Sequence, residues 1–330
     1  MALDDNIHRL LYKLAQAYYV DGLTQQEIAS RFGISRPKVS RMLQQGRQEG
    51  VININLVPPP SGTADLERAL EHTFGLEEAV VVTVNDVDDQ SDVARNLGPV
   101  AAETFIRCIH GNEVVGLTWG TYMLHMVHAL PVKFFPDVTV VQILGGLGPV
   151  GEMEHSTELV QLAAKRLNAR LRLLPAPGIV ASREAFDALK SDNQISETLA
   201  LGVRSDIVLV GLGLPSQDSI LVRDGKIITQ KDLTLVKEAG GVGDVVLRYI
   251  NAMGEPINLE INDRIIGLTL EQIKAVPRVI AVAGGRAKYA LIRAALRGHI
   301  MNVLVTDHAT AENLLEEADG SGKISGKING

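Results

Sequence analysis

The stretch from Leu23 to Arg47 carries side chains that suit contact with DNA. Its apolar residues Val39, Met42 and Leu43 lie at positions i, i+3 and i+4, as on the buried side of a helix. The polar residues between them face solvent, where arginine can pair with guanine edges, glutamine with adenine, and serine or lysine with phosphates. The residues we assign to DNA binding are Thr24, Gln25, Ser35, Arg36, Lys38, Ser40, Arg41, Gln44 and Arg47.

The alternative is that these charges only solvate a helix, and the charge distribution argues against it. No acidic residue lies between Phe32 and Gln48, although the whole chain carries a net charge of -7. Residues 1–57 hold seven Lys and Arg against five Asp and Glu, or +2, which leaves -9 for the remainder. A basic surface on an acidic protein predicts a double-stranded DNA partner.

A second group of candidate residues lies in glycine-rich segments that follow predicted strands. Glycine lets backbone N–H groups approach the oxygens of a ligand, and hydroxyl, carboxylate and amine groups can bind an anion or a polyol. Ligands of parallel α/β sheets bind at the carboxyl ends of the strands, so we predict an effector site there. The alternative is that such turns need glycine in any case. The candidates are Gly116, Thr118, Trp119, Gly120, Thr121, Gly145, Gly146, Gly211, Gly213, Asp244, Gly284, Gly285 and Lys288.

One glycine motif has the form of a dinucleotide fingerprint. Residues 146–151 read G-x-G-x-x-G, but a true fingerprint needs an acidic residue about 20 positions later. This chain has Arg170, Arg172 and Leu173 there, so we expect no NAD and no other cofactor. Cys108 is the single cysteine and no His/Cys cluster has ligand spacing, so we expect no metal.

Two short helices joined by a tight turn must position the DNA-facing residues. Thr24 and Glu27 form a capping box for the first, and Gly33 permits the turn. Ser35 is expected to cap the second helix. A supporting helix is predicted over residues 5–19, and an alternating strand over 51–56 that would form a wing or a small sheet closing the DNA-binding domain.

Strands and helices alternate through the rest of the chain. This rhythm predicts a doubly wound, mostly parallel α/β sheet. The expected strands are 79–84, 114–117, 138–144, 170–173, 207–210, 279–282 and 303–306. The expected helices cover 65–74, 91–109, 122–129, 157–167, parts of 183–199, the stretch up to 297 and a last one from 309.

The chain is predicted to contain two domains. Residues 1–57 form a helix-turn-helix, winged-helix-like domain, 58–62 a proline-rich linker, 63–319 the α/β effector-binding domain and 320–330 a disordered tail. Aliphatic side chains dominate a composition of 46% hydrophobic and 4% aromatic residues, as in parallel α/β proteins. No signal peptide and no apolar run of about 18 residues is present, so we expect a cytoplasmic protein with no membrane partner.

The motifs taken together resemble the SorC family of bacterial sugar-responsive transcriptional regulators. The similarity runs from about Leu11 to Leu315 and includes, in order, YYVDGLTQQEIASRFGISRPKVSRML, GLTWGT, GGLG, LVGLG, GGVGDV, AVAGGRAKYALIRAALRG and NVLVTD. The resemblance implies a helix-turn-helix domain joined to a domain similar to the sugar-phosphate isomerase and deaminase fold. It also implies a homo-oligomer, commonly a tetramer, that a sugar or phosphorylated sugar switches.

The same resemblance implies a ligand loop. It spans residues 116–121, is flanked by Gly145 and Gly146, and receives contributions from Asp244 and Lys288. Members that bind phosphorylated sugars can place an arginine beside the GGLG loop and a second hydroxyl after the loop's first threonine. Those positions look like Leu144 and Tyr122 here, which keeps a neutral sugar or polyol as an alternative.

Three functions are compatible with these features. The leading hypothesis is a DNA-binding regulator of carbohydrate metabolism whose operator affinity responds to a sugar, polyol or sugar phosphate. The alternative is a sugar-phosphate isomerase or deaminase with a DNA-binding appendage, which would need a paired acid and base. Asp206, Asp244 and Glu154 are possible carboxylates, but no such pair is legible, so we expect no enzyme. The strand-end loops argue against an architectural DNA binder without an effector.

Overall fold

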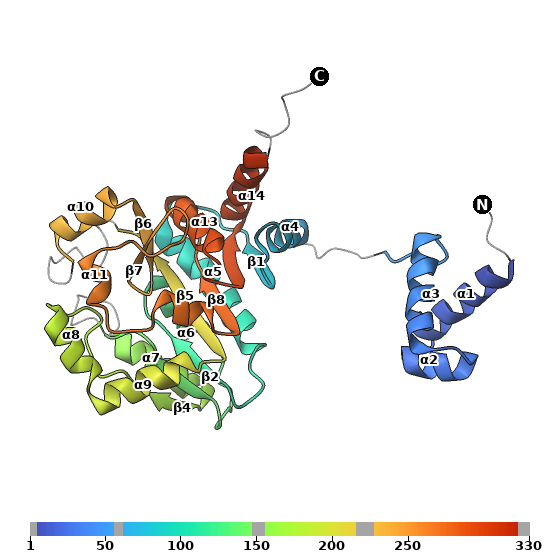
Figure 1. Ribbon diagram of the computed structural model, residues 1–330, viewed down its shortest axis with the longest axis horizontal. Coiled ribbons are helices and arrows are strands. Elements are labelled where there is room, and N and C mark those ends of the chain that lie inside the picture. Colours follow the sequence, from blue (N-terminus) through green and yellow to red (C-terminus); the bar gives the residue numbers. More distant parts are fainter. Residues whose placement is uncertain (1–4, 56–61, 147–155, 216–227, 323–330) are drawn as a thin grey trace, which may run out of the picture. The chain divides into compact units, whose positions relative to one another are not determined.

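The structure, a computed structural model, describes residues 5–55, 62–146, 156–215 and 228–322 (Figure 1). The chain divides into two units, residues 1–60 and 61–330, each with its own core. In the described ranges every helix is too short or too polar to span a bilayer.

Three helices form the N-terminal unit: α1 (Asp5–Tyr19), α2 (Gln25–Phe32) and α3 (Arg36–Gln48). Their shared core contains Leu14, Ile28, Val39 and Leu43, each almost fully buried. The predicted capping box is confirmed, because Thr24 accepts from the backbone of Glu27 and the Glu27 carboxylate accepts from Thr24. Gly33 has φ of 66°, the left-handed conformation that the turn between α2 and α3 requires.

Two details of this unit differ from the prediction. Residues 51–55 form no strand, because the described part of the unit has no second strand to pair with their backbone groups. Instead Ile52 donates its N–H to Gly46 and packs its side chain against that glycine, so the predicted wing is wrong over these residues. Ser35 occupies the N-cap position of α3, but its side chain makes no capping hydrogen bond.

A parallel sheet runs through the second unit in the order β1-β9-β8-β5-β2-β3-β4, and all its pairs are parallel. The doubly wound sheet that the sequence predicts is therefore confirmed. Its strands are β1 (Glu78–Val82), β2 (Val114–Leu117), β3 (Thr139–Gln142), β4 (Arg170–Arg172), β5 (Ile207–Gly213), β8 (Arg278–Val282) and β9 (Val303–Asp307).

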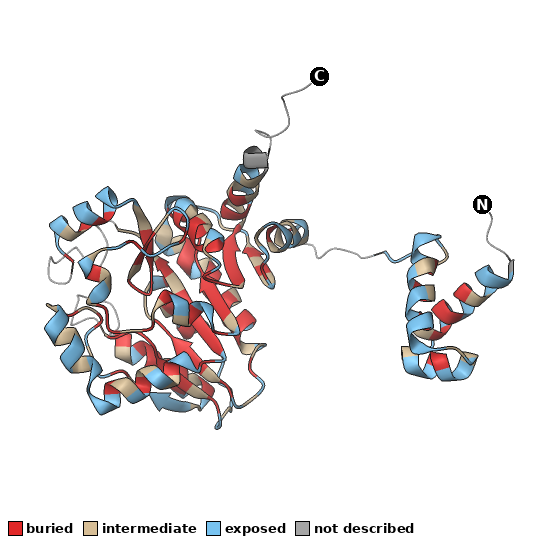
Figure 2. Cartoon of the chain, viewed as in Figure 1, coloured by how far each residue is buried: buried red, intermediate tan, exposed pale blue. Residues whose placement is uncertain are grey.

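Helices cover both faces of this sheet, and alternate strand residues enter two cores (Figure 2). Ile207 and Leu209 of β5 pack against α5 (Gln90–Ile106), α6 (Thr121–Ala129) and α7 (Ser156–Leu167). Val208 and Val210 enter the opposite core. The helices that contribute side chains to this opposite core, fully or in part, include α4 (Ala64–Phe74), α9 (Asn193–Val203), α10 (Gln230–Glu238), α11 (Glu260–Asp263), α12 (Leu270–Lys274), α13 (Tyr289–Arg297) and α14 (His308–Gly322). The remaining helices are α8 (Arg183–Lys190) and the 3₁₀ turn η1 (Arg286–Lys288).

An antiparallel hairpin, absent from the prediction, extends β5. It consists of β6 (Gly241–Val245) and β7 (Arg248–Asn251), and β6 pairs Asp244 with Gly213. The segment 241–244, predicted as a strand-end loop, is therefore a strand. At the other end of the chain, α14 continues to Gly322, so the tail predicted from 320 starts inside a helix, and 323–330 lie outside the described residues.

Candidate functional site

The predicted DNA-facing side chains lie on the surface of the N-terminal unit. All are exposed except Gln25, which is half-buried. In the part of the chain that the structure describes, Arg36, Lys38 and Arg41 form no ion pair, so their charges are available to a polyanion. The helix α3 thus presents a basic outer face over a buried stripe of Val39 and Leu43.

Arg47, at the carboxyl end of α3, is held by the end of α1. Its Nε and Nη2 atoms donate to the hydroxyl oxygen of Tyr19 at 3.2 and 2.7 Å. The two helices are therefore joined by a polar contact at the surface as well as by their core. Sequence reasoning found the arginine but missed the tyrosine that orients it.

In the second unit, Lys288 lies in the 3₁₀ turn that follows β8. Its side chain is only 7% exposed, and its Nζ donates to the carbonyl of Leu212 at 2.5 Å, at the end of β5. The ammonium group also lies 4.1 Å from the centre of the Tyr122 ring, a cation–π contact. The amine is therefore fixed at the carboxyl edge of the sheet.

Asp244 of β6 is buried beside this lysine. It is 5% exposed, and its Oδ2 accepts the backbone N–H of Leu247 at 2.9 Å. A Cβ on Gly213 would lie 2.2 Å from Asp244 Oδ1, so the carboxylate occupies space that only glycine leaves. Packing against Asp244 therefore explains the glycine at position 213.

Burial changes the acidity of both groups. It raises the pKa of Asp244 to about 6, although the N–H of Leu247 and the charge of Lys288 act in the opposite direction. It also lowers the pKa of Lys288 to about 8, opposed by the charge of Asp244. Near neutral pH both groups are therefore ionised, but the pKa of each lies closer to 7 than it would in water.

Tyr122, in the first turn of α6, connects the lysine to two other segments. Its hydroxyl lies 2.8 Å from the carbonyl oxygen of Gly284 and 3.1 Å from Oε1 of Gln90. Burial raises the pKa of this tyrosine far above its ordinary value, so the hydroxyl stays protonated and donates. Both Tyr122 and Gln90 were absent from the predicted site.

Gly284 and Gly285 fold tightly over Asp307, the last residue of β9. The Gly285 N–H donates to Asp307 Oδ2 at 2.6 Å, and the Thr310 hydroxyl donates to the same oxygen at 2.6 Å. A Cβ on Gly284 would lie 2.3 Å from that oxygen. The N–H of Gly285 therefore already has an acceptor within the protein.

The residues of segment 116–121 have different structural roles. Gly116 lies inside β2, where a Cβ would meet Ile143 and Val208 at 2.9 Å, so it serves packing. Thr118 is buried and donates its hydroxyl to the carbonyl of Leu209 at 3.0 Å. Gly120, with φ of 129°, is the N-cap of α6, and Thr121, the first helical residue, is exposed.

Trp119 ties this segment to the end of β3. Its indole Nε1 donates to the carbonyl of Gly145 at 2.9 Å. The N–H groups of Gly145 and Gly146 donate to the carbonyls of Ile266 and Ala176, both at 2.8 Å, so these two N–H groups already have acceptors within the protein. Residues 147–155, which hold the rest of the G-x-G-x-x-G motif, lie outside the described residues.

The structure therefore brings Asp244, Lys288, Gly213 and the start of α6 to one edge of the sheet. Gly211, inside β5, is different: a Cβ added there would meet no atom within 4 Å, so packing gives no reason for glycine at this position. Asp307 follows a predicted strand, and the strand-end rule that selected the other loops would have found it.

Two of the carboxylates considered for an enzyme, Asp206 and Asp244, lie at opposite edges of the sheet. Asp206 precedes β5 and accepts the N–H of Val114 at 2.8 Å, at the amino edge of the sheet. Asp244 pairs with the last residue of the same strand. A strand of this length separates its ends by about 20 Å. Glu154 lies outside the described residues.

Comparison with family models divides the chain in the same way as its cores. Residues 58–316 match a model described as "Putative sugar-binding domain", and residues 7–56 match a Crp-like helix-turn-helix domain.

Individual relatives extend over nearly the whole chain. A protein named deoxyribonucleoside regulator, from Bacillus subtilis (strain 168), is 31% identical over 96% of this chain and 100% of its own length. The transcriptional regulator LsrR of Enterobacter sp. (strain 638) is 32% identical over 93% of this chain and 92% of its own.

Two solved structures are similar to this chain over different shares of its length. The full-length sorbitol operon regulator SorC from Klebsiella pneumoniae superimposes with a TM-score of 0.70 at 27% identity, covering 94% of this chain and 100% of that one. A DeoR family transcriptional regulator from Listeria monocytogenes also gives 0.70, at 31% identity, over 76% of this chain and 99% of that one.

Proposed function

The chain belongs to the SorC family of transcriptional regulators, and on that premise we propose that α3 reads an operator whose affinity a small carbohydrate controls. The carbohydrate binds at the carboxyl edge of the sheet in the second unit. The protein thereby couples a metabolite signal to transcription of genes for carbohydrate use.

The observation that carries the effector site is the buried Asp244–Lys288 pair. Lys288 is fixed by Leu212 and Tyr122, and Asp244 by Leu247, so both groups are held in place before a ligand arrives. A carboxylate accepts from sugar hydroxyls and an ammonium donates to them, which suits a polyhydroxylated ligand. The edge where they lie is the usual binding position in parallel α/β sheets.

The start of α6 supplies a second binding element. A helix leaves its first N–H groups without partners inside the helix, and these favour an anion. Thr121 at this position is exposed and adds a hydroxyl. A phosphate would therefore bind at the α6 end and the sugar hydroxyls at Asp244, whereas a neutral polyol would use the hydroxyl contacts alone.

The arrangement of carboxylates supports a regulator without catalytic activity. Proton transfer on a sugar needs an acid and a base on either side of the reacting carbons. Asp244 is buried at the carboxyl edge of the sheet, and Asp206 lies at the opposite edge. We therefore propose that the sugar-phosphate isomerase-like sheet is used for binding only.

Operator recognition by this fold supports a homo-oligomer, and the family resemblance implies a tetramer. One helix-turn-helix reads one half-site, and paired half-sites reflect the symmetry of the protein. We propose that the acidic second unit, with net charge -9 outside residues 1–57, holds the subunits together. The basic first unit is then free to follow the DNA.

The experiment that tests this function is a thermal-shift screen followed by gel shifts. The screen compares sugars, polyols, deoxynucleosides and their phosphates, because the relatives are named for deoxyribonucleosides and for sorbitol. A ligand that binds the folded state raises the melting temperature. The same ligand must also change operator affinity. A ligand that stabilises the chain without affecting operator binding would contradict the proposal.

A further inference from the structure

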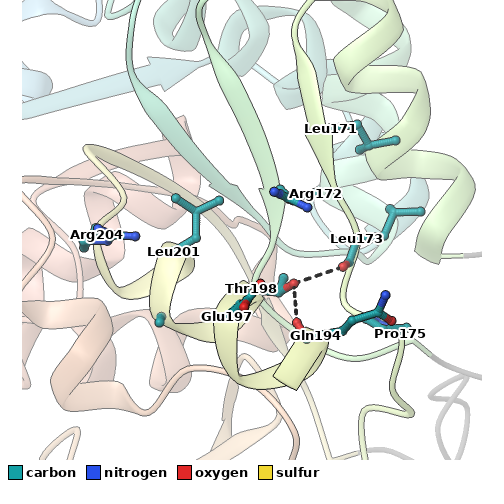
Figure 3. Close-up of a pocket in the computed structure, with 10 residues that line it drawn as sticks. Leu171, Arg172, Leu173, Pro175, Gln194, Glu197, Thr198, Leu201 and Arg204 are labelled. Carbon is teal, nitrogen blue, oxygen red and sulfur yellow. Dashed lines mark hydrogen bonds between the residues drawn. The ribbon is translucent and has the colours of Figure 1, made fainter. Parts of the chain in front are cut away.

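The last strand of the sheet, β4, leaves an open hollow beside α9 (Figure 3). All three residues of β4 are exposed, and the strand pairs only with β3. The hollow has a volume of about 650 Å³. Arg172 of β4 and Leu201 of α9 line it, whereas Leu171 and Leu173, which also border it, direct their side chains to the α7 side of the sheet (Figure 3). A strand edge with unpaired backbone groups is a surface that proteins usually cover.

Two opposite charges flank the second half of α9: Glu197 in the middle of the helix and Arg204 at its C-cap. Glu197 and Arg204 are both exposed, line the hollow, and form no ion pair within the described part of the chain. They are seven positions apart, which is about two helical turns or ~10 Å. The point midway between them falls between Ala200 and Leu201, which also line the hollow.

This spacing is self-complementary under a two-fold rotation. If a second α9 lies antiparallel across the midpoint, Glu197 meets Arg204 of the partner subunit and Arg204 meets Glu197 of the partner subunit. Ala200 then faces Leu201 of the partner subunit, and a small residue facing a large one permits the usual interaxial distance of about 8–10 Å. Such pairing of one patch with itself is the signature of a two-fold interface.

We propose that the hollow between β4 and α9 is a self-association surface, in which a second copy of this chain places its α9 antiparallel to the first. The inference rests on the proposed function, because it assigns a surface to the homo-oligomer that operator binding requires. A small ligand fits the hollow less well, because its charged side chains Arg172, Glu197 and Arg204 are all exposed.

The test uses charge reversal and rescue in the full-length chain. Glu197→Arg and Arg204→Glu each place like charges opposite one another, so each should weaken self-association by about tenfold or more in sedimentation equilibrium. The double variant places opposite charges face to face again, in exchanged positions. Its dissociation constant for self-association should therefore return to within about threefold of the wild-type value. Restoration by a second substitution separates an interface from a simple loss of fold.

Two matched controls lie on α10. Glu238→Arg and Lys237→Glu produce the same changes of net charge at exposed positions remote in sequence from the hollow, and they should leave self-association unchanged. A second variant, Ala200→Arg, should also weaken self-association, because it puts a bulky cation where the helices approach. Circular dichroism melts confirm that each variant is folded.

The possible outcomes separate this inference from the function on which it rests. A wild-type chain that is monomeric at micromolar concentration overturns both the homo-oligomer and this surface. An oligomeric wild type whose assembly is unchanged in all α9 variants keeps the homo-oligomer and overturns this surface. Weakening in both single variants without recovery in the double variant overturns the antiparallel arrangement.

Discussion

At the scale of single residues, the second unit is organised around a lysine that burial has made less basic. Lys288 has a pKa lowered to about 8 and is held by the carbonyl of Leu212 and the ring of Tyr122. Each of these contacts comes from a different element, so the position of the amine depends on the whole edge of the sheet. Substitutions at this edge of the sheet test effector affinity and the free energy of unfolding in separate experiments.

Lys288→Ala distinguishes a phosphorylated effector from a neutral one. With a phosphorylated ligand, the loss of a charge-assisted contact worth about 1.5–3 kcal/mol weakens binding more than tenfold. With a neutral polyol the loss is smaller and nearly independent of salt, because screening acts on charge pairs. Calorimetry at two salt concentrations measures both quantities. The variant should still bind operator and lose its response.

A second substitution tests the same effector site independently. Thr121→Val removes an exposed hydroxyl at the start of α6 with almost no change in volume, so it should weaken effector binding without affecting the fold. Unchanged effector affinity in both Lys288→Ala and Thr121→Val would place the site elsewhere.

The Asp244–Lys288 pair also predicts a pH dependence of stability. The pKa of Asp244 rises from 3.8 to about 6 on folding, so its ionisation lowers the free energy of unfolding between those pH values. The pKa of Lys288 falls from 10.5 to about 8, so stability recovers as the pH rises between 8 and 10.5. Each shift corresponds to on the order of 3 kcal/mol. Together the two shifts give a minimum in the free energy of unfolding between about pH 6 and 8.

The double variant Asp244→Asn/Lys288→Met removes both ionisations. Its gain in the free energy of unfolding over the wild type should be larger at pH 7 than at pH 5 or pH 9, by about 1–2 kcal/mol in urea titrations. The variant Lys237→Met/Glu238→Gln, on the exposed face of α10, is the control and should show no such maximum. A gain that is the same at all three pH values would contradict the assigned pKa shifts.

At the scale of elements, α3 depends on separate buried and exposed sets of residues. Arg36→Ala and Arg41→Ala alter only the exposed set, so they should leave the melting temperature unchanged and weaken operator binding by about 1–3 kcal/mol. A base-reading arginine relaxes specificity at one position, whereas a phosphate contact lowers affinity for all sequences and reduces the salt slope. Normal operator binding by both variants in gel shifts would show that α3 does not enter the groove.

The packing of α5 against α6 predicts an effect on stability. A Cβ on Gly98 would lie 2.7 Å from the backbone carbon of His125, and backbone cannot move aside cheaply. Gly98→Ala should therefore lower the free energy of unfolding by about 1–3 kcal/mol, although alanine is the better helix former. Gly211→Ala is the matched control, since no atom lies within 4 Å of its Cβ position. Equal stability of the two variants would contradict the close approach of these helices.

The elements that the sequence predicts well are those with an unambiguous period. The helix over Asp5–Tyr19 and the strand over Val114–Leu117 have the bounds expected from their apolar spacing. The hairpin β6–β7 was missed because GGVGDV reads as a turn, whereas its glycines leave room for Leu291 and Val236. A strand's partner is a tertiary property, so the pattern over 51–56 predicted a strand that has nothing to pair with.

The candidate effector site, like the fold, could be predicted from the sequence only in part. Strand-end position and residue chemistry selected Asp244 and Lys288, which the structure places together. The same rule could not show that the N–H groups of Gly145, Gly146 and Gly285 are already engaged, because their acceptors are distant in sequence. Tyr122 and Gln90 were missed because their contacts with each other and with Gly284 join residues that are distant in sequence.

At the scale of the whole molecule, two separately packed units serve two ligands. The cores of the units share no residue, so each ligand should act first on its own unit. In hydrogen exchange followed by mass spectrometry, operator DNA alone should slow exchange in peptides covering 24–47. Effector alone should slow exchange near 118–122, 244–247 and 284–288. Effector protection confined to the N-terminal unit would contradict the division of tasks.

The hydroxyl of Tyr122 has a consequence for how the specificity of such a regulator can change. The same side chain supports the Lys288 amine and ties the Gly284 loop to Gln90 of α5. A smaller residue at position 122 would enlarge the space for a ligand, but it would also remove the hydroxyl that bonds Gln90 Oε1 and leave the Gly284 carbonyl with only the longer bond, 3.4 Å, from Gln90 Nε2. We therefore expect substitutions at 122 and 90 to be viable mainly in combination, so that evolution toward a new inducer passes through paired rather than single changes.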